Sequence, residues 1–163
     1  MLKQSAVKVT IRGLSPLLQN NPIQMGQGGD GTSHKRTRPS KEVEAESTTY
    51  RDSNGALYMP SKAIFGCMLN AATDLKLKGS RKSLSTMLKG ATLGITDITG
   101  TQRQITLRDS NGNPLTEIDI YSDRCVIQKA GVIKHRAMIN EWNLEFIVKF
   151  ASEYVPAQSI REA

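Results

Sequence analysis

Alternation of apolar and polar residues predicts two strands, one near each end of the chain. Residues 7–11, Val-Lys-Val-Thr-Ile, alternate and include β-branched side chains, a pattern typical of a half-buried strand. Residues 142–150 alternate over their whole length, and Trp142, Phe146 and Phe150 fall on the apolar side. We expect this apolar side to form the core of a sheet.

A helical repeat of apolar residues begins at Ser61, which is a plausible N-cap after Pro60. The repeat continues to Leu75, and we expect the helix to end by Gly79. The stripe is expected to be buried against the apolar side of strand 142–150. Its central residues are Ile64, Cys67, Met68 and Ala71.

The pentapeptide Arg-Asp-Ser-Asn-Gly occurs twice, at 51–55 and at 108–112. Asn-Gly supplies the positive-φ residues that a tight reversal needs, so each copy predicts a hairpin. We attribute the repeat to turn chemistry rather than to a duplicated ligand-binding motif. The strands expected around the two turns are 48–50 with 56–59, and 105–107 with 115–120.

The other segments complete an α+β pattern. Further strands are expected at 91–98 and 125–133, and short helices at 83–89 and from 155 onward, the last being either short or incomplete at the C-terminus. Residues 20–47 are mostly polar and glycine-rich, which predicts a long loop. We therefore expect one domain over 1–163, an antiparallel sheet with helices on one face and this loop as an insertion.

Composition narrows the class of protein. The chain has 163 residues, with 22 Lys and Arg against 15 Asp and Glu, a net charge of +7. It contains no apolar run of the roughly 20 residues that span a bilayer, and no apolar segment near the N-terminus resembles a secretory signal. The two cysteines, Cys67 and Cys125, lie far apart in the sequence, which suits reduced thiols in a cytoplasmic protein.

The positive charge is clustered, and clustered cations attract a polyanion, although a solvated face without a ligand explains such clusters equally well. Only 5% of the residues are aromatic, which favours contacts with a nucleic-acid backbone over stacking on its bases. We expect the groups after the main helix and around residue 134 to border one groove. The candidate nucleic-acid-binding residues are Lys35, Arg36, Arg38, Lys62, Lys76, Lys78, Arg81, Lys82, Lys129, Lys134, His135 and Arg136.

Two segments carry a resemblance to a known family. Residues 57–72, Leu-Tyr-Met-Pro-Ser-Lys-Ala-Ile-Phe-Gly-Cys-Met-Leu-Asn-Ala-Ala, resemble the strand–Pro–Ser–helix signature of the RAMP superfamily, whose members form backbones of CRISPR effector complexes. Residues 9–18 are similar to that family's first strand and its following loop. The order of motifs, including 126–129, 134–136 and 141–142, also resembles small phage and prophage proteins. The resemblance implies a ferredoxin-like, RNA-recognition-type fold.

These observations favour a non-catalytic protein that binds single-stranded nucleic acid and assembles along the strand as an oligomer or filament. One alternative is a metal-dependent ribonuclease that uses Asp30, because some members of the resembling family cleave RNA with an aspartate in the loop after the first strand. The other is a phage structural or protein-binding module. No cofactor is expected, and neither histidine has the spacing of a metal site. The choice between DNA and RNA is left open.

Overall fold

The computed structural model describes residues 3–22, 39–77, 79–127 and 130–162. The chain divides into two compact units. The first, called the core unit, comprises Met1–Arg12, Tyr58–Leu107 and Asn143–Ala163. The second, called the hairpin unit, comprises Gly13–Leu57 and Arg108–Trp142.

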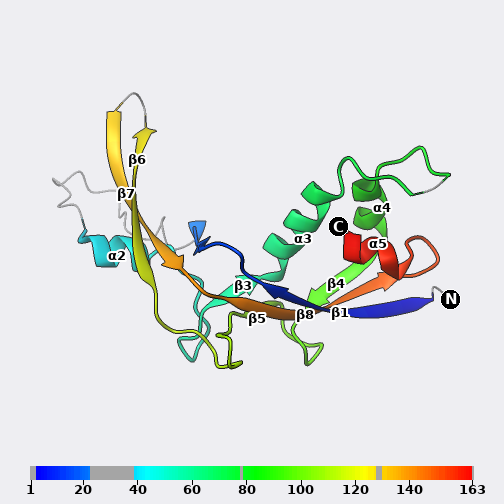
Figure 1. Ribbon diagram of the computed structural model, residues 1–163, viewed down its shortest axis with the longest axis horizontal. Coiled ribbons are helices and arrows are strands. Elements are labelled where there is room, and N and C mark those ends of the chain that lie inside the picture. Colours follow the sequence, from blue (N-terminus) through cyan, green and yellow to red (C-terminus); the bar gives the residue numbers. More distant parts are fainter. Residues whose placement is uncertain (1–2, 23–38, 78, 128–129, 163) are drawn as a thin grey trace, which may run out of the picture. The chain divides into compact units, whose positions relative to one another are not determined.

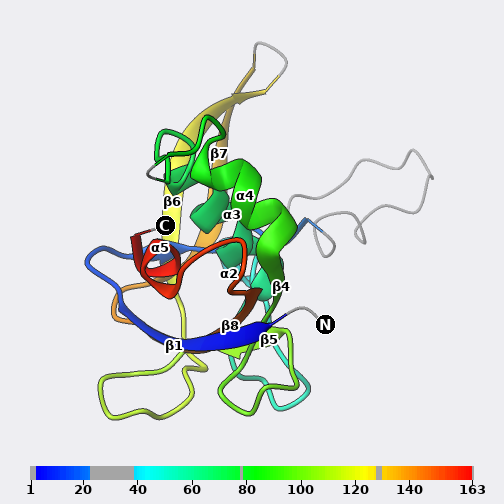
Figure 2. The ribbon, with the colours of Figure 1, turned by 90° about the vertical axis from the view of Figure 1, so that its right-hand side faces the viewer.

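A three-stranded antiparallel sheet is the base of the core unit (Figure 1). Strand β8 (Asn143–Ala151) lies between β1 (Gln4–Arg12) and β4 (Thr92–Thr96) and is antiparallel to both. Strands β1 and β4 therefore run in the same direction, and the chain passes between them through helices α3 (Ser61–Ala71) and α4 (Leu84–Ala91). This arrangement is a split β-α-β unit, with the helices on one face of the sheet (Figures 1 and 2).

The predicted alternation in the last strand is confirmed. Leu144, Phe146, Val148 and Phe150 are all buried, whereas the residues between them are half-buried. Trp142 does not belong to this core: it precedes β8, is only half-buried, and donates its indole Nε1–H to the backbone oxygen of Ser15 at 3.0 Å.

The main helix is shorter and buries a narrower face than its sequence predicts. It ends at Ala71, and the buried row consists of Ile64 and Met68, continued by Ala72 at the C-cap. Cys67 and Ala71 are exposed, so their predicted burial is wrong. The reason is geometric. Residues four apart lie in one row along a helix, and only this single row of α3 is buried against the rest of the core unit.

The step from strand to helix that the 57–72 segment predicts is present. Strand β3 (Tyr58–Pro60) leads directly into α3, and it pairs antiparallel with β5 (Gln104–Thr106). Pro60, rather than Ser61, occupies the N-cap position, and the Ser61 amide donates instead to the Arg103 carbonyl at 2.9 Å. The C-terminal helix, α5 (Ala157–Glu162), packs on β1.

The hairpin unit is built on a long two-stranded ribbon. Strands β6 (Asp119–Ile127) and β7 (Ala130–Ile139) pair antiparallel in continuous register, so the single strand predicted over 125–133 is wrong. Strand β2 (Leu17–Leu18) pairs on the other side of β7, and helix α2 (Lys41–Glu46) packs beside it. Helix α2 lies inside the predicted 20–47 loop, where Ser40 caps it through a 3.4 Å bond to the Val43 amide.

The two Arg-Asp-Ser-Asn-Gly copies fold into the same turn. In each, the aspartate Oδ1 accepts two backbone amides, from Asn54 and Ala56 to Asp52 and from Asn111 and Asn113 to Asp109, at 2.8–2.9 Å. Each turn also places a glycine at positive φ, +81° and +87°. The turns are therefore predicted correctly.

The strands expected beside these turns are only partly present. Isolated bridges join Arg51 to Leu57 and Arg108 to Pro114, but residues 48–50 form no strand. Strand β3 pairs with β5 instead of with 48–50.

The class of fold is mixed α/β with antiparallel sheets and few helices. Within the described ranges, no helix has the length and apolar character needed to cross a membrane.

Candidate nucleic-acid interface

The segment between α3 and α4 is a closed loop. Lys76 and Ser83 form an antiparallel bridge, and the Leu84 amide donates to the Leu75 carbonyl at 2.7 Å. Inside the loop, Ser80 Oγ accepts the Lys82 amide at 3.1 Å. These bonds bring the two ends of the loop together, so the cations at its start and at its end lie in one local region.

We call Lys76, Arg81 and Lys82 the basic loop. All three side chains are exposed, and none takes part in the ion pairs found among the described residues. Asp74 is the only acid between the end of α3 and the end of α4. Three cations near one acid give this surface a positive potential that is not compensated locally.

Lys62 does not belong to the basic loop. It lies in the first turn of α3, whereas the loop follows the other end of that helix. An α-helix rises about 1.5 Å per residue, so the eleven residues of α3 separate the two by roughly 16 Å. Lys62 is exposed, and no side chain caps the helix beside it.

The two candidate cations of the β6–β7 ribbon that the structure describes, Lys134 and Arg136, lie on one of its faces. Lys134 pairs across the ladder with Asp123, and Arg136 pairs with Tyr121. Paired residues of an antiparallel ladder point to the same face, so these four side chains share one face. Because Asp119 lies on that face too, opposite Met138, the face carries two acids for its two described cations.

His135 points to the opposite face of the ribbon. Its Nδ1 forms a 2.7 Å hydrogen bond with Ser122 Oγ, and its backbone amide donates to the Glu44 carboxylate of α2 at 3.3 Å. Two residues further along β7, the backbone amide of Ala137 donates to Thr48 Oγ1 at 2.9 Å. His135 therefore belongs to the contact that covers the β7 edge, and it lies apart from Lys134 and Arg136.

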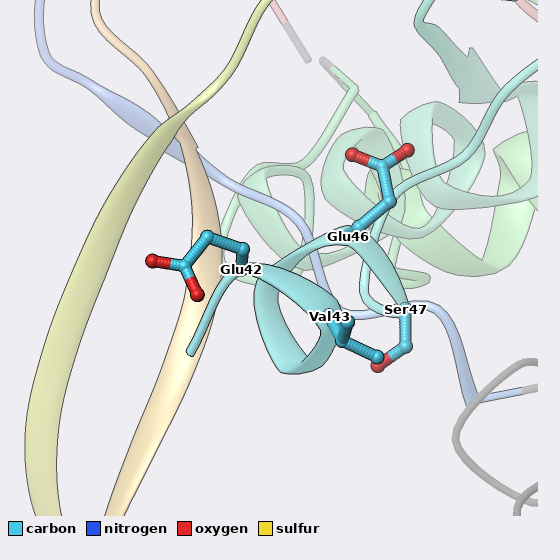
Figure 3. Close-up of a pocket in the computed structure, with 4 residues that line it drawn as sticks. All are labelled: Glu42, Val43, Glu46 and Ser47. Atoms are coloured by element: carbon cyan, nitrogen blue, oxygen red, sulfur yellow. The ribbon is translucent and has the colours of Figure 1, made fainter. Parts of the chain in front are cut away.

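Helix α2 presents an acidic hollow rather than a basic one. The hollow is lined by Glu42, Val43, Glu46 and Ser47, and its two carboxylates point away from each other (Figure 3). Backbone hydrogen bonding and the Ser40 hydroxyl at the start of α2 lower the pKa of Glu42. Glu46 is held in an ion pair by Arg51. This hollow does not suit a polyanion.

Two cations on the helix-free face of the core sheet were missed by the sequence analysis. Lys8 and Arg12 alternate with the helix-facing residues of β1, and both are exposed. Lys8 forms a 3.3 Å ion pair with Glu145 of β8, which partly compensates its charge. Strand alternation alone could have placed both residues on this face.

Several candidates lie outside the described residues, namely Lys35, Arg36, Arg38, Lys78, Lys129 and Asp30. The basic loop belongs to the core unit, whereas Lys134 and Arg136 belong to the hairpin unit. The common groove therefore stays a prediction.

No group of three or more His, Cys, Asp or Glu residues suited to a metal ion occurs in the described part of the chain. Comparison with protein-family models, with curated proteins and with solved structures finds no match.

Proposed function

We propose that the protein binds single-stranded nucleic acid without cleaving it, through contacts to the phosphate backbone, and that copies of it assemble along the strand. The observation that carries the proposal is the basic loop, where Lys76, Arg81 and Lys82 are exposed and make no ion pair with the described residues. Cations that form no ion pair within the described part of the chain can contact phosphates without first breaking such a pair.

The split β-α-β arrangement of the core unit supports a ferredoxin-like, RAMP-like fold as part of this proposal. In such a fold the third strand lies between the first and second, and here β8 lies between β1 and β4. The strand-to-helix step at Pro60 has the form that the RAMP-like segment implies. We extend the proposal to a cytoplasmic setting in a bacterial host and to an origin in a phage or prophage, on the same sequence resemblance.

Tyr121 offers a stacking platform on the ribbon. It is 37% exposed and lies opposite Arg136. Aromatic stacking contributes about 1–3 kcal/mol per base and tolerates any base. The ribbon therefore has the chemistry of a secondary contact, and the basic loop that of the primary one.

Fluorescence anisotropy with labelled single-stranded DNA and RNA, at two or more salt concentrations, tests the proposal. The variant R81E/K82E is expected to weaken binding of every sequence alike. Replacing one phosphate-contacting cation by alanine should lower the salt slope by about 0.7 on a single strand.

A charge-matched control is available in α2. Lys41 is exposed and already paired with Glu42, so K41E is matched in charge to the single variant R81E. R81E alone should weaken binding, whereas K41E should leave affinity nearly unchanged. Wild-type affinity of a folded R81E/K82E variant at low salt would refute the proposal. Cleavage of the oligonucleotide in the presence of Mg²⁺ would refute its non-catalytic part.

A further inference from the structure

The hydrogen-bond phase of the core sheet shows which backbone groups of β1 face away from β8. The Ser152 amide donates to the Lys3 carbonyl at 3.1 Å and the Gly13 amide donates to the Trp142 carbonyl at 2.8 Å, one at each end of the ladder. The register between them is unbroken, and bonded pairs alternate in an antiparallel ladder. Odd-numbered residues of β1 therefore bond to β8. The even-numbered residues, whose N–H and C=O groups face outward, are Gln4, Ala6, Lys8, Thr10 and Arg12.

This outward side of β1 has no strand partner in the described part of the chain. Strand β1 has nine residues and no proline, so it presents a long row of open donors and acceptors. Its apolar side chains are also incompletely covered. Ile11 is 36% exposed and Val9 is half-buried, whereas Phe146, opposite Val9 on β8, is only 2% exposed.

Pairing β1 with β1 of a second copy would give the outward backbone groups hydrogen-bond partners and would cover the partly exposed Ile11 side chain. In a two-fold antiparallel pairing, the outward N–H and C=O groups of one β1 must meet the outward groups of the other. Even-numbered residues therefore pair with even-numbered residues, and the two-fold axis passes through a residue that lies opposite its own copy. Centring on Lys8 would put two like charges directly opposite each other, which is unfavourable. Centring on Val9 places Val9 against Val9, Val7 against Ile11, and Lys8 against Thr10.

We infer that two copies of this chain associate through their β1 edges, in antiparallel register about Val9, to form one continuous sheet. The pairing is isologous, so the same residues are used by both copies and the assembly closes as a dimer. The apolar residues of the two strands form one row on the helix-bearing face, and the cations on the other face meet Thr10 or Ala6. The inference uses the core unit alone and does not rest on the proposed nucleic-acid binding.

Sedimentation velocity on the full chain, over a range of protein concentrations and without nucleic acid, measures the association. Thr10→Pro removes one outward N–H and leaves the ladder to β8 intact, because proline is tolerated on an edge strand whose N–H faces away. We expect this variant to fold, as judged by circular dichroism, and to stay monomeric. The matched control is Thr10→Val, which keeps the N–H and should dimerise like the wild type.

Disulfide formation tests the register and does not depend on the proline variant folding. In a Cys67→Ser, Cys125→Ser background, Val9→Cys should form a covalent dimer on mild oxidation, since Val9 faces its own copy. Val7→Cys alone should not cross-link, but a mixture of Val7→Cys and Ile11→Cys chains should.

Two results would overturn the inference. One is a wild-type chain that is monomeric at every concentration tested and does not cross-link through Val9→Cys. The other is a dimer that survives Thr10→Pro in a folded protein, because that dimer would use another surface. If β1 instead captures an extended segment of a different protein, the isolated chain gives the first of these results.

Discussion

Asp123 lies directly opposite Lys134 on the β6–β7 ribbon, with both side chains on the same face. Residues opposite each other in an antiparallel pair have Cβ atoms about 4.5–5.5 Å apart, which is close enough for their charges to interact. The stretch from Arg124 to Arg136 contains four cations and no acid when it is read along the chain. In the ribbon, Asp123 lies opposite Lys134, and Asp119 lies on the same face as Lys134 and Arg136. This face therefore has two acids for two cations, against one acid for three cations in the basic loop.

The first prediction compares these two groups of cations. Arg81→Ala should lower the salt slope of oligonucleotide binding by about 0.7, the value for one phosphate contact on a single strand. Lys134→Ala should lower it by less, because Asp123 opposite it already offsets part of the charge. Asp123→Ala should tighten binding. Equal slopes for Arg81→Ala and Lys134→Ala, with no effect of Asp123→Ala, would contradict this assignment.

The second prediction concerns the repeated turn. Asp52 Oδ1 accepts the amides of Asn54 and Ala56, both at 2.9 Å, so Asp52→Ala should destabilise the fold by about 1 kcal/mol in urea denaturation. Asp109→Ala should act in the same direction through the same bonds. Ser53→Ala is the matched control, because Ser53 is exposed and changing it leaves those bonds in place. An Asp52→Ala variant as stable as Ser53→Ala would show that the turn does not need the carboxylate.

Local patterns predicted the elements whose formation depends on local chemistry. The alternation of 142–150 identified β8. The Asn54-Gly55 pair identified a turn, because glycine readily adopts the positive φ that this turn requires. The start of α3 directly after Pro60 was also predicted to within one residue. In each case the residues that decide the conformation are neighbours in the sequence.

Partners that are distant in the sequence were not predictable in this way. Strand β3 was expected to pair with 48–50, its neighbour across the turn, but it pairs with β5 some forty-five residues later. The 125–133 strand was misread because both arms of the β6–β7 ribbon are extended, and apolar periodicity does not reveal where a chain of extended residues reverses. The same limit applies to the candidate site, since a linear count of charges cannot place Asp123 opposite Lys134.

The third prediction is a pH dependence from the Glu46–Arg51 ion pair. Hydrogen bonds from Arg51 lower the pKa of Glu46 from its usual value of 4.5. A lowered folded-state pKa contributes stability that is present above pH 4.5 and is lost as the pH falls through the folded-state value. Wild-type protein should therefore be more stable than Glu46→Gln near pH 6. The difference in free energy of unfolding should be smaller at about pH 3. Glu117→Gln, an exposed control, should show no such convergence, and a constant difference for Glu46→Gln would contradict the assignment.

The final prediction concerns two glycines in different packing environments. The Gly13 amide donates to the Trp142 carbonyl at 2.8 Å, and a Cβ at Gly13 would overlap the indole, lying 2.8 Å from Cδ1. The indole is held in place by its bond to Ser15, so it cannot move away without losing that bond. Gly66 lies inside α3, and a Cβ there would meet no atom within 4 Å.

The same substitution should thus have opposite effects at the two positions. Gly66→Ala should stabilise the protein by about 0.5–1 kcal/mol, because alanine loses less backbone entropy than glycine in a helix. Gly13→Ala should destabilise it by about 1–3 kcal/mol, the usual cost of overpacking. Urea denaturation of both variants measures the two effects, and a stabilised Gly13→Ala would contradict the close approach of Trp142. Adding Trp142→Leu to Gly13→Ala should recover part of the lost stability, because removing the indole removes the overlap. A double-mutant cycle separates this coupling from the cost of losing the tryptophan itself.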